Sequence, residues 1–426
     1  MRYRVLSLDG GGSWALIQVK ALIALYGEDA LGRSVLQDFD LVAANSGGSI
    51  VLGCLLENFS LSRILAFFND EAERKAVFSK TGSFGDRVFH DLTGLGPKYS
   101  AESKLPALQH VLADTGNQSL TKVASGIRRG NTADDLHVLI IGFDYDRNRA
   151  AFFRSAAASG PGWGEGAASD ITLAEAIHAS TNAPVNYFDA PAIFPDRNGR
   201  YWDGAISGCN NPVLAAVTEA IIKHRDPADI VALSIGTASV ALPWPQPGEP
   251  ASPYVKELVE PGIKNDLVKL ATSILDDPPD IATFLAHVVT GSGIGLGLPT
   301  VDSRIVRMSP LVSPVKKTVN GTDAWTAPGS MAAAQFKYLA NLDMDAVEQA
   351  QVDAISQYAD LWLQGIAPNQ PIRMNGDTLR CELGQTKFGD AKIAWEALNQ
   401  GFSGSVSSLS QPVALTAEEE EMQEVE

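Results

Sequence analysis

The stretch FDLVAANSGGSI, residues 39–50, passes from an apolar run into a serine flanked by small residues and then into a second apolar run. The first run predicts a buried strand over residues 39–44, and the run that follows the serine predicts a helix over 47–59. A hydroxyl group at such a junction lies where a strand ends and a helix begins. This junction therefore indicates both a fold class and a place for a reactive side chain.

The same alternation of strand and helix runs through the first 240 residues. Strands are predicted at 2–8, 39–44, 137–144, 151–156, 200–204 and 229–237, and helices at 14–27, 47–59, 172–180 and 212–224. Alternating elements of this kind are typical of an α/β fold, with a central, mainly parallel sheet flanked by helices. We therefore expect the catalytic core within residues 1–240.

The regular pattern weakens beyond residue 240, and we expect four further parts. They are a Pro- and Gly-rich insertion or lid at 241–330, a helical segment at 331–365 that packs back on the core, a small appended unit at 366–412, and an acidic disordered tail at 413–426. The sequence assigns no role to the appended unit. No internal repeat is visible.

The composition limits the classes of partner. The chain has 426 residues, of which 45% are hydrophobic and 19% charged, so it can bury a large core. Its net charge of −17 weighs against nucleic acid as a partner, because phosphate binding needs basic stripes that the sequence lacks. The same charge weighs against strong non-specific adsorption to an anionic bilayer.

Targeting signals and cysteine patterns favour a cytoplasmic setting. The N-terminus enters a strand-like pattern at once, without an apolar signal region. No stretch approaches the roughly 18 to 20 uninterrupted apolar residues of a membrane span. The three cysteines, Cys54, Cys209 and Cys381, are far apart and form no CxxC pair, which argues against a disulfide scaffold and a structural zinc site.

The serine lies in a five-residue turn that fits the nucleophile-elbow pattern G-x-S-x-G, with alanine in place of the first glycine. Its residues are Ala44, Asn45, Ser46, Gly47 and Gly48. A tight strand-to-helix turn needs small side chains two residues before and two after the serine, as found here. The hydroxyl would then lie at a helix N-terminus, which favours negative charge. A plain serine N-cap explains the same residues, and the motif alone leaves both interpretations open.

The stretch LDGGGSWA, residues 8–15, provides a second signal. Gly10, Gly11 and Gly12 follow a predicted strand, and backbone amides of glycines beside a nucleophile can supply the donors of an oxyanion hole. A dinucleotide fingerprint would need an acidic residue about 20 positions later, at the end of the next strand. That strand ends instead at the serine turn, and no Gly-Lys-Ser/Thr follows the glycines, so nucleotide loops are disfavoured.

The stretch YWDGAISGCNNP, residues 201–212, provides a third signal. Asp203 ends a predicted strand before Gly204, where its carboxylate could meet Ser46 across the edge of the sheet. An ordinary Asp-Gly turn explains the same pair and is favoured when the dipeptide is considered alone.

Together and in this order, the three signals resemble the patatin-like phospholipase family. The resemblance covers residues 2–240 and extends to HASTNAPVNYF (178–188) and LSIGT (233–237). It implies an α/β fold with a Ser–Asp dyad, in which Ser46 attacks an ester carbonyl and Asp203 serves as the base. It further implies that the three glycines hold the oxyanion, and that no metal or other cofactor is needed.

The implied function is a phospholipase A-type lipid acyl hydrolase, acting on phospholipid or related lipid esters, with peripheral association at a membrane surface left open. Two departures affect the resemblance. Trp14 and Ala15 stand where the family usually has Arg-Gly, and Ala44 stands where it usually has Gly. Two alternatives remain: a soluble esterase or thioesterase, and an inactive lipid-binding or interaction module. Head-group preference, acyl position, activating ligand and oligomeric state are not determined by the sequence.

A histidine could complete a Ser-acid-His triad instead of a dyad. The usual order nominates His224 or His287, and His178 precedes the STNAP segment. His224 lies at the end of a predicted helix and His287 lies in an apolar run outside the core. We therefore expect a dyad, which requires a raised pKa of Asp203 or its close approach to Ser46.

Overall fold

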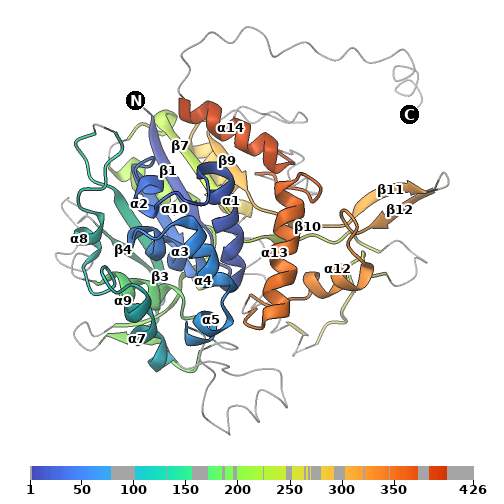
Figure 1. Cartoon of the computed structure of the whole chain (residues 1–426), viewed down its shortest axis with the longest axis horizontal. Helices are drawn as coiled ribbons and strands as arrows, with labels where there is room; N and C mark the ends of the chain where they lie inside the picture. The colour runs from blue at the N-terminus through green and yellow to red at the C-terminus, as the bar shows by residue number, and fades with distance from the viewer. Residues whose placement is uncertain are drawn as a thin grey trace.

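The computed structural model describes most of the chain, as drawn in Figure 1. The described residues are 2–77, 101–130, 132–155, 171–184, 188–194, 199–223, 225–245, 252–262, 265–266, 269, 280–291, 303–319, 322–344, 346–372 and 383–400. Within them a mainly parallel sheet lies between two hydrophobic cores, one on each face, which confirms the predicted α/β class.

The main sheet has eight strands. They are β1 (Tyr3–Leu8), β2 (Leu41–Asn45), β3 (His137–Asp144), β4 (Arg149–Arg154), β5 (Ala192–Phe194), β6 (Gly199–Asp203), β7 (Ile230–Ile235) and β9 (Ile305–Met308). Strands β9, β7, β1, β2 and β3 are parallel neighbours in that order. β4 and β6 run antiparallel to β3, and β5 antiparallel to β6. All six predicted strands are confirmed.

Helices cover both faces because side chains alternate along each strand. They are α1 (Leu16–Tyr26), α2 (Gly32–Leu36), α3 (Ser46–Leu56), α4 (Leu61–Asn69), α5 (Glu71–Val77), α7 (Ala101–Val111), α8 (Leu120–Ala124), α9 (Leu173–Ser180), α10 (Val213–Ile222), α12 (Ala333–Ala340), α13 (Gln349–Leu363) and α14 (Phe388–Gln400). In β1, Leu6 packs in the core that includes α1 and α3, and Val5 packs in the core that includes α10.

The pairing along β3 brings two strand ends together. Leu139 pairs with β2 on one side and β4 on the other, while Gly142 pairs with β6 and β4. β2 and β6 therefore share one edge of β3, one after the other. Asn45 ends β2 opposite Ile141, and Asp203 ends β6 opposite the next residue, Gly142. The residue that follows β2 is thus placed beside the last residue of β6.

The sheet continues past residue 240, so the predicted end of the core is too early. β9 pairs with β7, and all four of its residues are buried. Residues 280–289 form a helix whose apolar side chains pack in the core that includes α10. The range 241–330 therefore contributes to the core and is more than an insertion or lid. β8 (Ser239–Val240) lies just before this range, which also holds β10 (Leu311–Val312) and the hairpin of β11 (Val315–Val319) and β12 (Thr322–Thr326).

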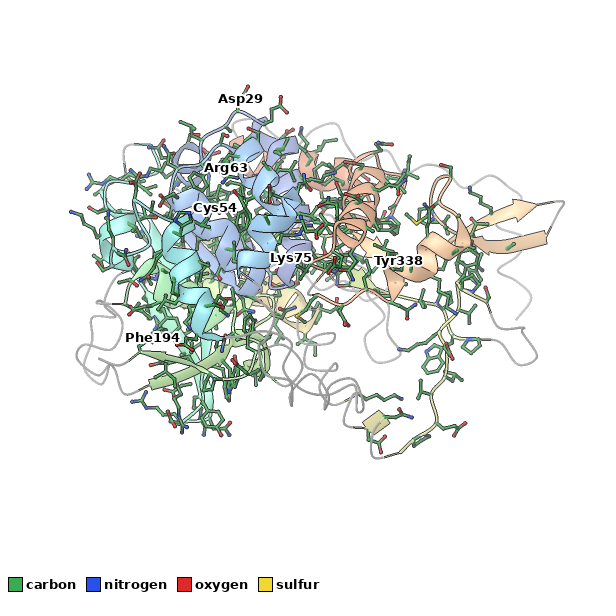
Figure 2. The ribbon with its side chains drawn as sticks, turned by 60° about the horizontal axis from the view of Figure 1, so that its bottom comes forward. Asp29, Cys54, Arg63, Lys75, Phe194 and Tyr338 are labelled. Atoms are coloured by element: carbon green, nitrogen blue, oxygen red, sulfur yellow. The ribbon has the colours of Figure 1, made fainter. Side chains whose placement is uncertain are left out.

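The predicted helical segment at 331–365 consists of two helices, α12 and α13, and not one. Gln351 accepts a hydrogen bond from the backbone N–H of Glu348, which fixes the start of α13. α13 lies beside α1 (Figure 1). Tyr338 of α12 lies on the side of the molecule opposite Phe194 of β5 (Figure 2).

The predicted appended unit also belongs to the core where it is described. Trp395 of α14 stacks on Phe39 with ring centroids 5.8 Å apart, which joins the helix to the start of the chain. Residues 401–426, with the predicted acidic tail, lie outside the described residues, as does Cys381. Cys54 and Cys209 are free. No helix in the described part of the chain is both long and apolar enough to cross a membrane.

Candidate active site

Ser46 occupies a strained turn between β2 and α3. Its φ is +47°, in the left-handed region, which costs a residue other than glycine about 1–3 kcal/mol. A serine N-cap has an extended backbone and accepts an amide proton from the first turn. Here Asn45 has the extended backbone, with φ −130° and ψ 147°, and Ser46 is already the first residue of the helix. The geometry therefore favours the elbow over the plain N-cap.

The small residues of the turn allow α3 to approach the end of β1. A methyl group at Gly48 would lie 2.4 Å from the carbonyl oxygen of Leu8 and 2.6 Å from that of Asp9. A methyl group at Gly47 would lie 2.5 Å from the carbonyl oxygen of Gly12. The expected need for small residues is explained by this backbone-to-backbone contact, and Ala44 is fully buried in β2.

The structure brings Ser46 and Asp203 together. The Ser46 hydroxyl lies close enough to the Asp203 carboxylate to oppose, as a hydrogen-bond donor, the rise of that carboxyl's pKa. The Asp203 Oδ1 also accepts hydrogen bonds from Asn45 Nδ2 at 3.1 Å and from the backbone N–H of Ala205 at 2.9 Å. Ser46 is 6% exposed and Asp203 is 2% exposed. The carboxylate is therefore fixed in direction and largely shielded from water.

Asn45 and Ser180 support this pair. The Ser180 hydroxyl accepts the backbone N–H of Ser46 at 2.9 Å and donates to Asn45 Oδ1 at 3.4 Å. Asn45 was predicted only as a turn residue, whereas its side chain contacts the carboxylate of Asp203. Ser180 was not predicted as a site residue, although it lies in the HASTNAPVNYF stretch that supports the family resemblance.

A buried lysine lies behind Asp203. The backbone N–H of Asp203 donates to the carbonyl oxygen of Asn182 at 2.9 Å, and the Asn182 Oδ1 accepts a hydrogen bond from Lys104 Nζ at 2.8 Å. Lys104 is fully buried in α7, and its Nζ lies 3.7 Å from the ring centroid of Phe188. The sequence gives no signal for this residue, because a lone lysine in a partly polar helix predicts a solvated side chain.

Burial and nearby charges shift the titration of this cluster. Burial raises the pKa of Asp203, and this rise is opposed by its hydrogen bonds and by the charge of Lys104. Burial holds the pKa of Lys104 well below its usual value, while the charge of Asp203 acts in the opposite direction. Burial, with a further contribution from Lys104, lowers the pKa of His178 to about 2, so this imidazole is neutral.

The glycine loop lies against the elbow, and its three glycines differ. The backbone N–H of Gly10 donates to the carbonyl oxygen of Asn210 at 2.8 Å, and the Gly10 carbonyl accepts from Thr237 Oγ1 at 2.5 Å. Within the described residues, no hydrogen bond uses the amides of Gly11 and Gly12. Of the three amides expected to hold an oxyanion, those of Gly11 and Gly12 therefore remain candidates, whereas that of Gly10 is already used.

The departures from the family pattern have a structural explanation. The indole N–H of Trp14 donates to the carbonyl oxygen of Asp343 at 3.1 Å, and the backbone N–H of Ser13 donates to that of Met344 at 3.1 Å. Trp14 thus attaches the glycine loop to the segment between α12 and α13. Ala15 is fully buried beside the elbow, with its Cβ 3.1 Å from the place a methyl group at Gly47 would take.

The histidines do not complete a triad among the described residues. The ring of His178 packs on Phe194, with centroids 6.2 Å apart. His287 lies in the helix at residues 280–289, on the face of the sheet opposite α3. Its Nδ1 lies 2.7 Å from Ser303 Oγ. His224 lies outside the described residues. In the same part of the chain, no group of three or more His, Cys, Asp or Glu side chains is placed to hold a metal ion.

Comparisons with known proteins identify the family. A search of curated protein sequences found no match. Among solved structures, the crystal structure of VipD from Legionella pneumophila is similar with a TM-score of 0.35 and 12% sequence identity, over 84% of this chain and 66% of VipD. This chain therefore spans just under two thirds of VipD. Residues 6–217 match the family model described as patatin-like phospholipase, and the chain belongs to the patatin-like phospholipase family.

Proposed function

We propose that this protein is a lipid acyl hydrolase of phospholipase A type, which cleaves carboxylic ester bonds of phospholipids or related lipids. The observation that carries the proposal is the close approach of the Ser46 hydroxyl, at a strained turn, to the buried carboxylate of Asp203. This contact follows from the pairing of β3, which sets the ends of β2 and β6 at consecutive positions.

In the proposed reaction, Asp203 accepts the hydroxyl proton as Ser46 Oγ attacks the ester carbonyl carbon. The tetrahedral intermediate collapses, the alcohol leaves with the proton from Asp203, and an acyl-serine remains. Asp203 then takes a proton from water as the water oxygen attacks the acyl carbon. The second tetrahedral intermediate collapses, Asp203 returns the proton to Ser46 Oγ, and the fatty acid is released with both side chains restored. Asn45 and the Ala205 amide hold the carboxylate in the direction that both steps need.

The amides of Gly11 and Gly12 are the proposed donors to the developing oxyanion. The N-terminus of α3, which begins at Ser46, adds a favourable dipole and the amide of Gly47. Loss of one such donor in acyl-transfer enzymes costs about 10²–10³ in kcat. Because the donors are backbone groups, the presence of Trp14 and Ala15 in place of Arg-Gly leaves this chemistry intact.

The proposed substrate lies at a membrane surface, and the proposed setting is cytoplasmic with peripheral association. The family membership supports a lipid substrate in general. The phospholipid substrate distinguishes this proposal from a soluble esterase or thioesterase. The hydrolysis of that substrate distinguishes it from an inactive lipid-binding module. Each of these alternatives predicts a different result in the same experiment.

The test measures fatty-acid release from phosphatidylcholine vesicles and from a short-chain water-soluble ester, together with labelling by a fluorophosphonate. Ser46→Ala should abolish labelling and lower hydrolysis by at least about 10⁴-fold, and Asp203→Asn should act similarly. The matched control is Ser34→Ala, at an exposed position in α2, which should keep wild-type activity. Full activity of the Ser46→Ala protein would refute the proposal. Wild-type activity on the short ester alone would favour the soluble esterase. A wild-type protein that the fluorophosphonate does not label would favour the inactive module.

A further inference from the structure

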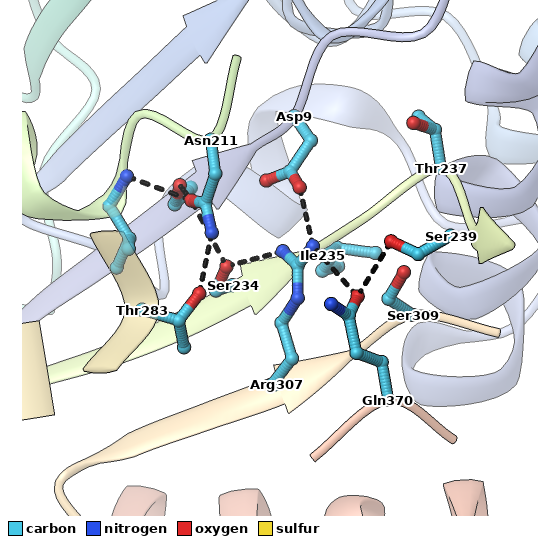
Figure 3. A network of polar contacts seen from close by, with 12 residues as sticks. Asp9, Asn211, Ser234, Ile235, Thr237, Ser239, Thr283, Arg307, Ser309 and Gln370 are labelled. Atoms are coloured by element: carbon cyan, nitrogen blue, oxygen red, sulfur yellow. Dashed lines mark hydrogen bonds and ion pairs between the residues drawn. The ribbon is translucent and has the colours of Figure 1, made fainter. Parts of the chain in front are cut away.

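The glycine loop is held by a residue that lies far beyond the segment matched to the family. Asp9 immediately precedes Gly10, and its carboxylate pairs with Arg307 of β9 (Figure 3). The matched segment ends at residue 217, so β9 is outside it. The two side chains are each 3% exposed. A buried ion pair therefore connects the proposed oxyanion loop to the last strand of the sheet.

Arg307 makes several hydrogen bonds from one guanidinium group. Its Nη2 donates to Asp9 Oδ2 at 2.6 Å, and its Nη1 donates to Ser234 Oγ at 2.8 Å. The Nη2 also lies 3.4 Å from Gln370 Oε1. A planar guanidinium can meet these acceptors together, whereas the single ammonium group of a lysine cannot reproduce the fork. The position of Arg307 is thus fixed by β7 and by the segment after α13.

Asp9 is fixed on its backbone as well. Its N–H donates to the carbonyl oxygen of Ile235 at 3.1 Å, and its carbonyl accepts from Gln18 Nε2 at 2.9 Å. The second carboxylate oxygen, Oδ1, is buried and accepts no hydrogen bond from the described residues. A buried carboxylate is costly unless a cation is paired with it. Arg307 is the paired cation, and without it the start of the loop would carry an uncompensated charge.

We propose that Arg307 is a positioning residue for the glycine loop: through Asp9 it fixes the backbone from which Gly11 and Gly12 present their amides. The C-terminal half of the chain then helps to position the proposed active site and is not only a structural addition. The catalytic consequence rests on the proposed function, whereas the positioning of the loop does not.

The experiment compares Arg307→Met with Arg154→Met in the full chain. Arg154 of β4 pairs with Glu219 of α10 at 3.0 Å, and Glu219 is 5% exposed, so this control also breaks a largely buried ion pair made by a strand of the same sheet. Amide hydrogen exchange in the peptide covering residues 9–15 measures directly how firmly the backbone of the loop is held. Exchange in this peptide should become at least about tenfold faster in Arg307→Met and stay at the wild-type rate in Arg154→Met.

Hydrolysis of the short-chain ester provides the second reading, corrected for the fraction of folded enzyme. Arg307→Met should lower kcat by about 10- to 100-fold with KM changed by less than about threefold, because oxyanion donors act in the transition state. The double variant D9N/R307M should recover thermal stability, since no lone charge is left, but kcat should stay low. Should Arg307→Met fail to fold, R307K keeps the charge without the fork and should show the same changes at smaller size.

Two results would overturn the proposal: wild-type exchange of residues 9–15 in a folded Arg307→Met protein, or an equal loss of kcat in Arg154→Met. Failure of the proposed function looks different, because a Ser46→Ala protein would then hydrolyse the ester as wild type does. The exchange measurement would still decide whether Arg307 positions the loop.

Discussion

At the scale of single residues, the charge state of Asp203 controls the proposed reaction. Only the carboxylate can accept the proton of Ser46, so activity must fall as the pH drops through the pKa of Asp203. Burial raises this pKa, and the positive charge that Lys104 carries when protonated opposes the rise. The second ionisable group near the pair, His178, is neutral and adds no charge. Lys104 is therefore the side chain whose removal should change the pH dependence.

We expect Lys104→Gln to shift the acid limb of kcat/KM to higher pH while the plateau at high pH stays close to wild type. Gln can still donate to the Asn182 side chain, so the variant removes the charge and keeps the hydrogen bond. The measurement is a pH–rate profile from about pH 5 to about pH 9. An acid limb at the wild-type position would mean that Lys104 is only structural. Lys122→Gln, on the surface of α8, is the control and should leave the profile unchanged.

At the scale of secondary structure, the contact between α3 and β1 sets the position of the nucleophile. We predict that Gly48→Ala destabilises the protein by about 2–3 kcal/mol and abolishes labelling of Ser46, because the added methyl group would meet two backbone carbonyls that cannot move aside. Urea unfolding and fluorophosphonate labelling measure the two effects.

Gly389→Ala in α14 is the matched control for this substitution. A methyl group there meets nothing within 4 Å, so stability should rise or stay within about 1 kcal/mol of wild type. If Gly48→Ala is as stable and as reactive as this control, the close contact between α3 and β1 does not position Ser46.

The elements that could be predicted from the sequence are those buried on both faces. β3 has the predicted bounds, 137–144, because a strand covered on two sides forms a continuous apolar run. β9 was missed because it has only four residues and one of them is Arg307. The break between α12 and α13 was missed because the residues on both sides of it form one long helical pattern, although the segment in the break also accepts hydrogen bonds from the distant glycine loop.

The candidate site shows the same division between local and distant causes. Ser46 and Asp203 are predictable because a tight strand-to-helix turn and a strand-end carboxylate leave short sequence patterns. The side chains that surround them leave none. Lys104 and Arg307 are basic residues that would normally be solvated, and each is buried because of partners contributed by other elements. Burial of this kind is a property of the assembled fold.

At the scale of the whole molecule, the chain folds as an integrated unit in which the C-terminal half completes the core. β9 covers the edge of β7, and α13 contributes five buried side chains to the core that includes α1. These are Val352, Ile355, Tyr358, Ala359 and Trp362. The Trp362 indole also donates to Asn369 at 3.0 Å, close to the segment that contacts Arg307. The first half alone would expose both the strand edge and the apolar surface of α1.

We therefore predict that a fragment of residues 1–245 does not fold by itself. It should be insoluble or bind a hydrophobic dye strongly, because an exposed strand edge and a large apolar patch favour aggregation. Co-expression with the complementary fragment, residues 246–426, should yield a soluble complex that is labelled at Ser46. A monomeric 1–245 fragment with a cooperative urea transition and a reactive Ser46 would contradict the prediction, since the N-terminal half would then be independent of β9 and α13.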